Sequence, residues 1–390
     1  MTNEIKNIPQ LRFPNFDGDW EECKLEEISD KVTEKNKNNQ FSETLTNSAE
    51  YGVISQRDFF DKDISNEKNL NGYYIVQEDD FVYNPRISNF APVGPIKRNK
   101  LGRTGVMSPL YYVFRTRNID VVFLDYYFET TGWHKFMKLN GDSGARADRF
   151  AIKDLIFKTM PIPYPIIEEQ EKIGNFFSKL DRQIELEEQK LAKLEEQKKG
   201  YMQKIFSQEI RFKDDNGNDY PEWESKKFLD IYKLVPSKNN QIKSSEVVEN
   251  GIIPVVDQGK DIFLGYSNEK DKAIEDFDNV IVYGDHTTII KYIKEPFIIG
   301  GDGVKLLESN DGSLIHYLYI LLQYFNVKPE GYKRHYSILK NKMMNISITK
   351  EEQEKIGNFF TKFDELIEKQ NQKIDGLKKR KKGFLQKMFI

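Results

Sequence analysis

The sequence is poor in the residues that build metal sites and disulfides. Its 390 residues include one cysteine and four scattered histidines. A single cysteine excludes an intramolecular disulfide and suits a reducing compartment, so we expect the chain in the cytoplasm. The histidines show no metal-ligand spacing, so no metal site is predicted. The first residues lack the apolar segment of a secretory signal.

Long hydrophobic runs and catalytic motifs are also missing. The longest apolar run, residues 314–325, is interrupted by polar residues and is too short to cross a bilayer. Residues 84–86 (Asn-Pro-Arg) lack the second proline and the aromatic residue of an adenine methyltransferase motif, and residues 300–305 have no P-loop spacing. Residues 285–287 (Asp-His-Thr) have no nucleophile motif beside them. We therefore expect no membrane association and no catalytic residue.

Two long stretches of the chain repeat each other. Residues 168–206 and 351–389 match without a gap, and the first ten residues of the two stretches are identical. Such a repeat indicates a duplicated module. Neither stretch contains proline, and Glu crowds the first turn and Lys the last turns, as the helix dipole favours. The sequence therefore predicts two long helices, the second with a capping box formed by Thr349 and Glu352.

Apolar residues recur along both stretches in alternating steps of three and four, the a and d positions of a coiled coil. Matched polar residues interrupt the two seams, at Glu187 with Gln370 and at Lys198 with Lys381. We expect the helices to pair antiparallel, because the chain between them must return; two surface helices on separate cores are the alternative. The seam residues are Ile173, Phe177, Leu180, Ile184, Leu191, Leu194, Tyr201 and Ile205 in the first helix, and Ile356, Phe360, Phe363, Ile367, Ile374, Leu377, Phe384 and Met388 in the second.

A globular segment precedes each long helix. The phrase at residues 11–13 and 20–21 (Leu-Arg-Phe, then Trp-Glu) returns at residues 210–212 and 223–224 as Ile-Arg-Phe, then Trp-Glu. The duplicated module is therefore a globule followed by a helix. The phrase at residues 210–224 directly follows the first long helix. We therefore expect its N-terminal copy to dock near the end of the C-terminal helix, which gives a cyclic arrangement.

Both globules alternate short β-rich runs with turns and carry one internal helix. The proline-rich residues 160–165 must be extended and bound the first long helix. The predicted strands are residues 73–76, 81–83, 111–114, 252–256, 280–283 and 297–299, and the predicted internal helices are residues 124–136 and 313–324.

The segment from Phe81 to Ile119 contains no aspartate or glutamate, although the chain carries a net charge of −3. Arg and Lys neutralise phosphates, and Arg, Asn and Gln read base edges. The alternative is that these are ordinary solvated charges. The residues that we expect to contact DNA are Arg86, Ser88, Asn89, Lys97, Arg98, Arg103, Arg146, Arg149, Gln258, Lys260, His286, Thr287, Lys333, Arg334, His335 and Tyr336.

These features together resemble the specificity subunits of type I restriction-modification enzymes. The resemblance is carried by the repeated Glu-Glu-Gln-Glu-Lys-Ile-Gly-x-Phe-Phe helices, by the Arg-Phe and Trp-Glu phrases, and by residues 255–260 and 282–287. It implies an α+β fold of two similar target-recognition domains joined by an antiparallel coiled coil, in a cyclic, pseudo-two-fold arrangement. The implied segments are a loose tail (1–10), a first recognition domain (11–165), a first spacer helix (166–208), a second recognition domain (209–348) and a second spacer helix (349–390).

The same resemblance implies what such a chain binds. Each recognition domain would read one half of an asymmetric, split site in double-stranded DNA, without catalysis by this subunit. Two modification subunits, which bind S-adenosylmethionine and methylate adenine, would dock on the helices. Two restriction subunits would add cleavage driven by ATP and Mg, so this chain itself would hold no cofactor. Two other interpretations stay open: the specificity part of a stand-alone DNA methyltransferase, and a protein-binding coiled-coil scaffold.

Overall fold

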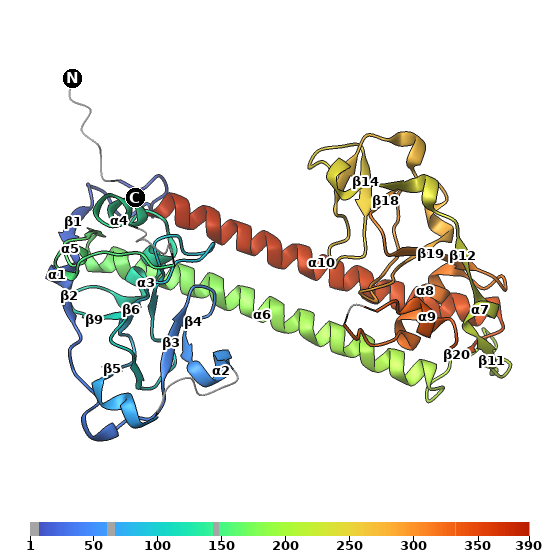
Figure 1. Cartoon of the computed structure of the whole chain (residues 1–390), viewed down its shortest axis with the longest axis horizontal. Coiled ribbons are helices and arrows are strands. Elements are labelled where there is room, and N and C mark those ends of the chain that lie inside the picture. The colour runs from blue at the N-terminus through green and yellow to red at the C-terminus, as the bar shows by residue number, and fades with distance from the viewer. Residues whose placement is uncertain (1–7, 61–66, 143–147, 332, 390) are drawn as a thin grey trace. The chain divides into compact units, whose positions relative to one another are not determined.

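The computed structural model of the chain describes residues 8–60, 67–142, 148–331 and 333–389. The chain forms two compact units. The first unit consists of Met1–Glu187 with Lys373–Ile390, and the second consists of Glu188–Gln372. The divisions fall inside the two long helices, so each unit contains one globular region and a part of both helices (Figure 1).

A four-stranded antiparallel sheet lies at the centre of the first unit. One face of the sheet packs on α3 (Val121–Glu129). On this face the Phe81 ring contacts Phe114 of the neighbouring strand, with 5.4 Å between ring centroids, and Phe128 of the helix, with 5.9 Å. Side chains alternate between the two faces of a strand, so the next residue, Val82, points to the other face. The strands lie in the order β2 (Ser29–Lys31), β9 (Tyr112–Thr116), β6 (Phe81–Tyr83) and β7 (Ile96–Arg98).

The other face of this sheet is covered by two smaller antiparallel pairs. Val82 and Val113 form one apolar cluster there with Leu45, Val76 and Met107 of the smaller pairs. This layer places the ends of several strands close to the loop between β6 and β7. The pairs are β3 (Leu45–Ser48) with β4 (Gly52–Ser55), and β5 (Tyr74–Val76) with β8 (Gly105–Met107).

The second unit repeats the order of the central sheet. It adds a second sheet whose strands β13, β18 and β14 run parallel, and α8 (Ile315–Phe325) packs in the same core as the central sheet. The two sheets are β12 (Tyr232–Val235), β19 (Val304–Ser309), β16 (Ile281–Gly284) and β17 (Ile290–Lys291), and β13 (Gln241–Ile242), β18 (Ile298–Gly300), β14 (Ile253–Val256) and β15 (Gly265–Ser267). The predicted strands, the helix over 313–324 and the similarity of the two globules are thus confirmed.

A short antiparallel pair connects each globule to its long helix. In both units the strand after the Trp-Glu phrase pairs with the strand that leads into the long helix. A one-turn helix follows the first strand of each pair. These elements are β1 (Glu21–Lys24), α1 (Leu25–Ile28) and β10 (Pro161–Tyr164) in the first unit, and β11 (Glu224–Lys227), α7 (Phe228–Ile231) and β20 (Met343–Ile346) in the second. The remaining α-helices are α2 (Gln56–Phe60), α4 (His134–Asn140), α5 (Asp154–Phe157) and α9 (Tyr336–Leu339).

The two long helices are α6 (Ile167–Phe206) and α10 (Lys350–Met388). In the first unit their segments run antiparallel. Phe176 near the start of α6 packs on Phe384 near the end of α10, at 5.1 Å between ring centroids. Eleven residues further along α6, Glu187 pairs with Lys373, which lies eleven residues earlier in α10, at 2.6 Å. The antiparallel prediction is therefore confirmed in this unit.

The second unit shows the same direction of pairing. Lys198 of α6 pairs with Asp364 of α10 at 2.6 Å, and further along α6 the ring of Phe206 packs on the ring of Phe360, earlier in α10. The polar break at Lys198 is repeated in the first unit, where Lys381 pairs with Asp181 at 2.8 Å. The repeat relates Lys198 to Lys381 and Asp364 to Asp181. The two ion pairs are therefore equivalent.

Most of the predicted seam is buried. Tyr201 is 42% exposed, but its ring still packs on Phe359 and Phe363, with centroids 5.3 and 5.8 Å away. The half-buried seam residues are Leu191, Leu194, Phe363, Ile367 and Phe384. The buried seam residues are Ile173, Phe177, Leu180, Ile184, Ile205, Ile356, Phe360, Ile374, Leu377 and Met388.

The N-terminal phrase docks on the last turns of α10, as the cyclic arrangement requires. The Leu11 backbone N–H donates to the Lys387 carbonyl at 2.8 Å, and Trp20 packs on Phe389. In the second unit the equivalent bond, from Ile210 N–H to the Lys204 carbonyl at 3.1 Å, lies within continuous chain. Figure 1 shows the end of α10, in red, beside α3 of the first unit.

Two local predictions are wrong. The helix predicted over 124–136 is two helices, because α3 ends at Glu129 and α4 begins at His134; between them the Thr130 hydroxyl caps the Tyr127 carbonyl and Trp133 is buried. The capping box of α10 is absent. Within the described chain the Thr349 hydroxyl has no hydrogen-bond partner, and the Glu352 carboxylate is taken by other side chains.

Candidate nucleic-acid interface

Equivalent hairpins of the two central sheets, β6–β7 and β16–β17, carry several of the predicted DNA contacts. In the first unit, residues 84–95 connect β6 to β7 and include Arg86, Ser88 and Asn89. In the second unit, residues 285–289 connect β16 to β17 and include the predicted pair His286 and Thr287. The two loops occupy equivalent places in the topology although their lengths and sequences differ.

The β6–β7 loop is joined to a segment that precedes α5. The Ile87 N–H donates to the Asp148 carbonyl at 3.0 Å, and the Phe150 N–H donates to the Pro85 carbonyl at 2.7 Å. These two bonds flank an isolated antiparallel bridge between Arg86 and Arg149. The two arginines therefore lie opposite each other as a non-hydrogen-bonded pair, the arrangement that brings cross-strand side chains closest. Both are exposed.

A buried asparagine, Asn47, and a half-buried one, Asn84, hold the base of the β6–β7 loop. The Asn84 side-chain amide donates to the Asn47 carbonyl at 2.7 Å, and its side-chain oxygen accepts from the Arg86 N–H at 3.0 Å. The Asn47 amide donates in turn to the carbonyls of Val82 and Pro95. The sequence offered no sign of this role for Asn47, which depends on contacts made far along the chain.

In the second unit Gln258 is the centre of the polar network. Its side-chain oxygen accepts from the His286 N–H at 3.2 Å, and its backbone carbonyl accepts from the Thr287 hydroxyl at 2.7 Å. Gly284 and Gly303 leave room for this arrangement. A Cβ at Gly284 would collide with the Thr287 hydroxyl, and a Cβ at Gly303 would lie 2.7 Å from the Gln258 amide nitrogen. Three predicted residues from distant segments thus meet.

The β16–β17 loop also meets the segment before α9, as its counterpart meets the segment before α5. The His286 Nδ1 lies 3.0 Å from the Lys333 carbonyl, and the Tyr336 N–H donates to the Asp285 carboxylate at 2.9 Å. Lys333 and Arg334 are exposed. In both units, therefore, the hairpin loop and the segment before the last short helix form one edge.

His335 does not belong to the exposed surface. Its side chain is fully buried, its Nε2 accepts from the Glu330 N–H at 2.9 Å, and its Nδ1 lies 3.0 Å from the Asp285 carbonyl. Since Nε2 accepts, the proton sits on Nδ1 and the ring is neutral. We therefore reassign His335 from a DNA contact to a residue that joins two loops. Tyr336 is half-buried, with its ring on Phe228.

Several cations of the acid-free segment obtain carboxylate partners from elsewhere in the chain. Arg98 lies 3.1 Å from Asp79 and 3.4 Å from Asp125. Arg103 makes two bonds of 2.8 Å to Glu43, and this contact holds the pKa of the Glu43 carboxyl below its usual value. Arg98 and Arg103 are therefore already neutralised. Lys100, Arg115 and Arg117 are paired in the same way, with Asp125, Asp80 and Asp30.

Among the other predicted cations, Lys333 also has a carboxylate partner, Glu330 at 2.9 Å. Within the described residues, Arg86, Lys97, Arg149 and Lys260 form no ion pair. The predicted contact at Arg146 lies outside the described residues. Two of these unpaired cations, Arg86 and Arg149, lie where the β6–β7 loop meets its partner segment.

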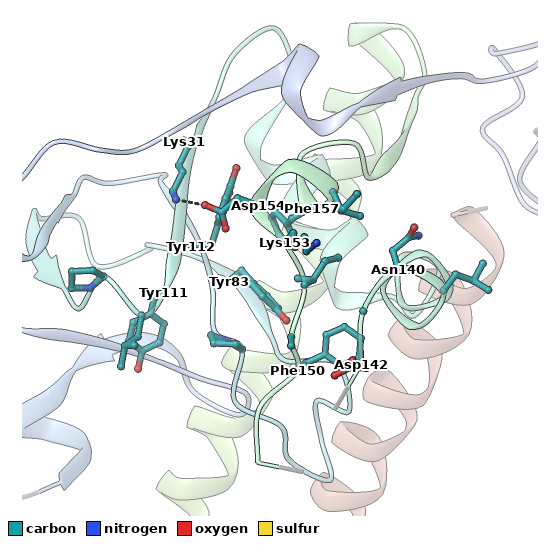
Figure 2. Close-up of a pocket in the computed structure, with 18 residues that line it drawn as sticks. Lys31, Tyr83, Tyr111, Tyr112, Asn140, Asp142, Phe150, Lys153, Asp154 and Phe157 are labelled. Carbon is teal, nitrogen blue, oxygen red and sulfur yellow. Dashed lines mark hydrogen bonds and ion pairs between the residues drawn. The ribbon is translucent and has the colours of Figure 1, made fainter. Parts of the chain in front are cut away.

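A cavity of about 870 Å³ opens beside the β6–β7 loop of the first unit (Figure 2). Pro85 and Phe150, the residues joined by a backbone bond, form part of its lining. Tyr112 lines it too, and burial, ahead of the charges of Asp154 and Glu26, raises the pKa of the Tyr112 hydroxyl to about 12. Two lining polar groups already have protein partners, since the Lys31 ammonium pairs with Asp154 and the Tyr83 hydroxyl donates to the Val93 carbonyl.

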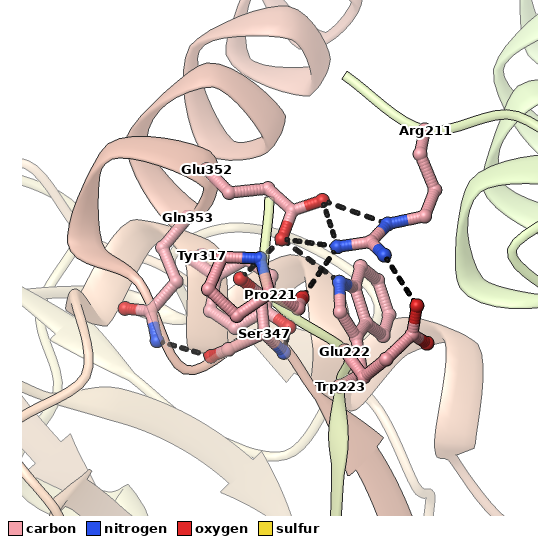
Figure 3. A network of polar contacts seen from close by, with 8 residues as sticks. All are labelled: Arg211, Pro221, Glu222, Trp223, Tyr317, Ser347, Glu352 and Gln353. Atoms are coloured by element: carbon pink, nitrogen blue, oxygen red, sulfur yellow. Dashed lines mark hydrogen bonds and ion pairs between the residues drawn. The ribbon is translucent and has the colours of Figure 1, made fainter. Parts of the chain in front are cut away.

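A buried carboxylate fixes each globule on its long helix, and Figure 3 shows the one in the second unit. In the second unit Glu352 accepts from Arg211, at 3.2 Å, from Trp223 Nε1, at 2.9 Å, and from the Ser347 hydroxyl, at 2.6 Å. This contact explains why the Arg-Phe and Trp-Glu phrases recur.

The first unit repeats the contact. Glu169 accepts two bonds of 2.7 Å from Arg12 and one of 3.2 Å from Trp20. The repeated glycines serve the same junction: a Cβ at Gly174 would lie 3.0 Å from the Asp120 carboxylate, and a Cβ at Gly357 would collide with the His316 ring. The repeat therefore preserves the seating of each globule on its helix.

The described residues contain no group of three or more His, Cys, Asp or Glu side chains that could hold a metal ion. Over the same ranges, no helix is long and apolar enough to cross a membrane.

Comparison with known protein families shows the family of the chain. A family model described as "Type I restriction modification DNA specificity domain" matches residues 17–196 and again residues 220–379. Two matches, one to each globule with most of its long helix, cover most of the chain. The chain belongs to the type I restriction-modification specificity family.

Two archaeal members of this family show how far the similarity extends. The MjaVIII specificity subunit of Methanocaldococcus jannaschii is 27% identical over 159 residues, which is 39% of this chain and 36% of that protein. The MjaIX specificity subunit of the same organism is 29% identical over 168 residues, 41% of this chain and 35% of that protein. The aligned segments span about a third of each relative.

Solved structures from type I restriction-modification systems share the fold. The S subunit of a type I restriction-modification system from M. genitalium has a TM-score of 0.60 and 14% identity, covering 98% of this chain and 99% of that chain. A chain from a structure on complex assembly and conformational transition of the type I R-M system has a TM-score of 0.53 and 13% identity, covering 95% and 97%. At these identities the likeness shows the fold alone.

Proposed function

We propose that this specificity-family chain is the DNA-reading subunit of a type I restriction-modification complex, and that its two units read the two halves of an asymmetric, bipartite site. The observation that carries the proposal is the edge common to both units. In each unit the hairpin of the central sheet, β6–β7 or β16–β17, is hydrogen-bonded to the segment before the last short helix, α5 or α9. Both edges present basic and polar side chains. Equal frameworks with different loops suit readers of different sequences.

The direct contacts in this proposal fall into two kinds. Arg86, Lys97, Arg149, Lys260 and Arg334 are exposed or half-exposed cations that suit phosphate oxygens. Amide and hydroxyl side chains suit base edges, because they present paired donors and acceptors. The residues of this second kind are Ser88, Asn89, Gln258 and Thr287, together with His286. Arg98 and Arg103, which already have carboxylate partners, are secondary candidates.

The long helices supply the surface for partner subunits in this proposal. The first turns of the two helices are identical in sequence. The contact between each globule and its helix explains why the buried residues repeat, but it does not explain why the exposed residues repeat. Glu168, Glu171 and Asn175 are exposed at steps of three and four, so they share one helix face. Their exposed counterparts on α10 are Glu351, Glu354 and Asn358. Two equal surfaces suit two copies of one partner.

We propose modification subunits as that partner, with restriction subunits joining the same complex. The chemistry would then belong to these partners: S-adenosylmethionine in the methyltransferase, and ATP with Mg in the translocating nuclease. The chain itself would act by binding alone, in the cytoplasm and without a cofactor of its own. A methyltransferase activity of the isolated chain would contradict this division of roles.

The loop assignment predicts unequal effects of two arginine substitutions. Arg86→Ala should weaken binding to all duplexes alike and lower the salt slope of binding by about one, because a phosphate contact is lost. Arg103→Ala should change the slope less, because Glu43 already neutralises that guanidinium. The measurement is titration of a labelled duplex, enriched from a random library by the purified chain, at several salt concentrations. Wild-type affinity and slope for Arg86→Ala would remove this loop from the interface.

A further inference from the structure

Phe90 stands at the tip of the β6–β7 loop and has 82% of its surface exposed, more than any other large apolar side chain of the described residues. A single exposed apolar residue is common and by itself indicates nothing. Two features of its surroundings set this one apart: a rigid turn that holds it outward, and a pair of facing arginines at the base of the same loop.

A closed turn holds Phe90 at the tip of the loop. The Ser88 N–H donates to the Ala91 carbonyl at 3.1 Å, and the Ala91 N–H donates to the Ser88 carbonyl at 3.0 Å. The Ser88 hydroxyl accepts from the same Ala91 N–H at 3.2 Å. Asn89 and Phe90 are thus the two central residues of a closed turn. Ala91 and Val93 behind it are buried, so the tip projects from an anchored base.

The facing arginines lack a counter-charge. Like charges directly opposite each other on paired strands destabilise the pairing. Arg86 and Arg149 occupy such positions, and within the described residues neither has a carboxylate partner. An anion between them would relieve the repulsion. The loop therefore offers an anion site at its base and an apolar ring at its tip.

Duplex DNA supplies a partner for both features. Its phosphates flank stacked bases, whose faces are apolar and become accessible when a step is opened. We infer that Phe90 is a wedge that stacks between base pairs of the bound duplex, while Arg86 and Arg149 hold the adjacent phosphate. This inference rests on the proposed DNA-reading function and adds a specificity-determining residue to it, because pyrimidine–purine steps open most easily.

The second unit lacks the wedge. Its equivalent loop, residues 285–289, is shorter and contains no Phe, Tyr or Trp. The Gln258 network ties His286 and Thr287 down. The two halves of the site are therefore treated differently: the half that the first unit reads is unstacked at one step, and the half that the second unit reads keeps regular stacking.

The test uses the full chain and the duplex that the wild-type chain enriches from a random library, with 2-aminopurine placed at successive positions. Wild-type binding should raise the fluorescence at one step in one half-site. Phe90→Ala should abolish this rise and weaken binding on the order of tenfold, as loss of one base–aromatic stack does, with the salt slope unchanged. Phe90→Trp should keep both the fluorescence rise and the affinity.

The matched control is Leu155→Ala, which removes another highly exposed apolar side chain of the first unit (71%), outside the β6–β7 loop, and should bind like wild type. Wild-type affinity and fluorescence for Phe90→Ala would overturn the wedge and leave the proposed function standing. So would unchanged DNA binding together with loss of the modification subunit on co-purification, which would place Phe90 in a protein interface. If the wild-type chain enriches no duplex, the proposed function itself fails, and the wedge with it.

Discussion

Glu169 and Glu352 show what a single residue contributes to this chain. Each lies in the first turn of a long helix, is at most 1% exposed, and accepts bonds from an arginine and a tryptophan of the preceding phrase. A buried carboxylate is tolerated only when it is paired and hydrogen-bonded. The repeated helix sequence therefore conserves a joint between globule and helix as well as a seam.

Removing that carboxylate charge should cost much of the stability of the second unit. We expect Glu352→Gln to lower the free energy of unfolding by about 3–5 kcal/mol, because the largely buried Arg211 then loses its close carboxylate partner and keeps only the 3.8 Å contact with the exposed Glu222. The neighbouring exposed substitution Glu351→Gln is the control and should change it by less than about 0.5 kcal/mol. Thermal unfolding checks both, and equal melting temperatures for the two variants would mean that the joint contributes little.

Cys23 gives a second prediction at this scale. The residue is half-buried in β1, and burial, more than the nearby Glu27 carboxylate, raises the pKa of its thiol to about 11. The thiolate is the reactive form, and at pH 8 only about one thiol in a thousand would be deprotonated at any moment, against about a quarter for a free cysteine of pKa about 8.5. Alkylation should therefore be slow in the native chain and fast in urea. Equal rates in both would contradict the burial.

Residue roles were the hardest part of the site to predict from sequence. The acid-free segment marked the β6–β7 loop, because a local excess of one charge is visible in the sequence. The partners of Arg98 and Arg103 were not visible, because Asp125 and Glu43 come from distant positions in the chain. His335 looked like a polar loop residue, and only the meeting of two loops buries it.

At the scale of elements, the long helices were predictable because two independent signals agree. An apolar period of three and four fixes the buried face, and the duplication fixes the extent. Breaks between short helices were not predictable in the same way. Residues 124–136 are apolar towards both ends, but Thr130, Thr131 and Gly132 between them are poor helix formers, and α3 ends there with the Thr130 hydroxyl donating to the Tyr127 carbonyl.

The seam gives the prediction that belongs to the helices. Ile184 is buried in a cluster with Leu180 and Leu377, whereas Leu186 two residues away is 48% exposed. Ile184→Asp should lower the free energy of unfolding by about 2–5 kcal/mol, because it removes apolar burial and places an unpaired charge in the seam. Leu186→Asp should be nearly neutral. Chemical denaturation separates the two, and equal midpoints would show that the α6–α10 contact does not stabilise the first unit.

At the scale of the whole molecule, duplication has produced two units with one framework and two sets of loops. The order of strands in the central sheets is the same, and so is the joint to the helix. The hairpin loops differ: the β6–β7 loop carries Asn89 and the exposed Phe90, and the β16–β17 loop carries His286 tied to Gln258. In this account DNA recognition belongs to the hairpin loops. The central sheet and its joint to the long helix repeat because both units must hold a loop on a helix in the same way.

The most direct test of this account is the sequence that the chain selects. Selection from a random duplex library, with the modification partner present, should give two short specific blocks separated by an unspecific spacer of fixed length. Replacing residues 209–348 with the matching segment of another family member should change one block and leave the other block and the spacer as they were. A single continuous block in the wild type, or a swap that changes both blocks or neither, would contradict the reading of two half-sites by two independent units.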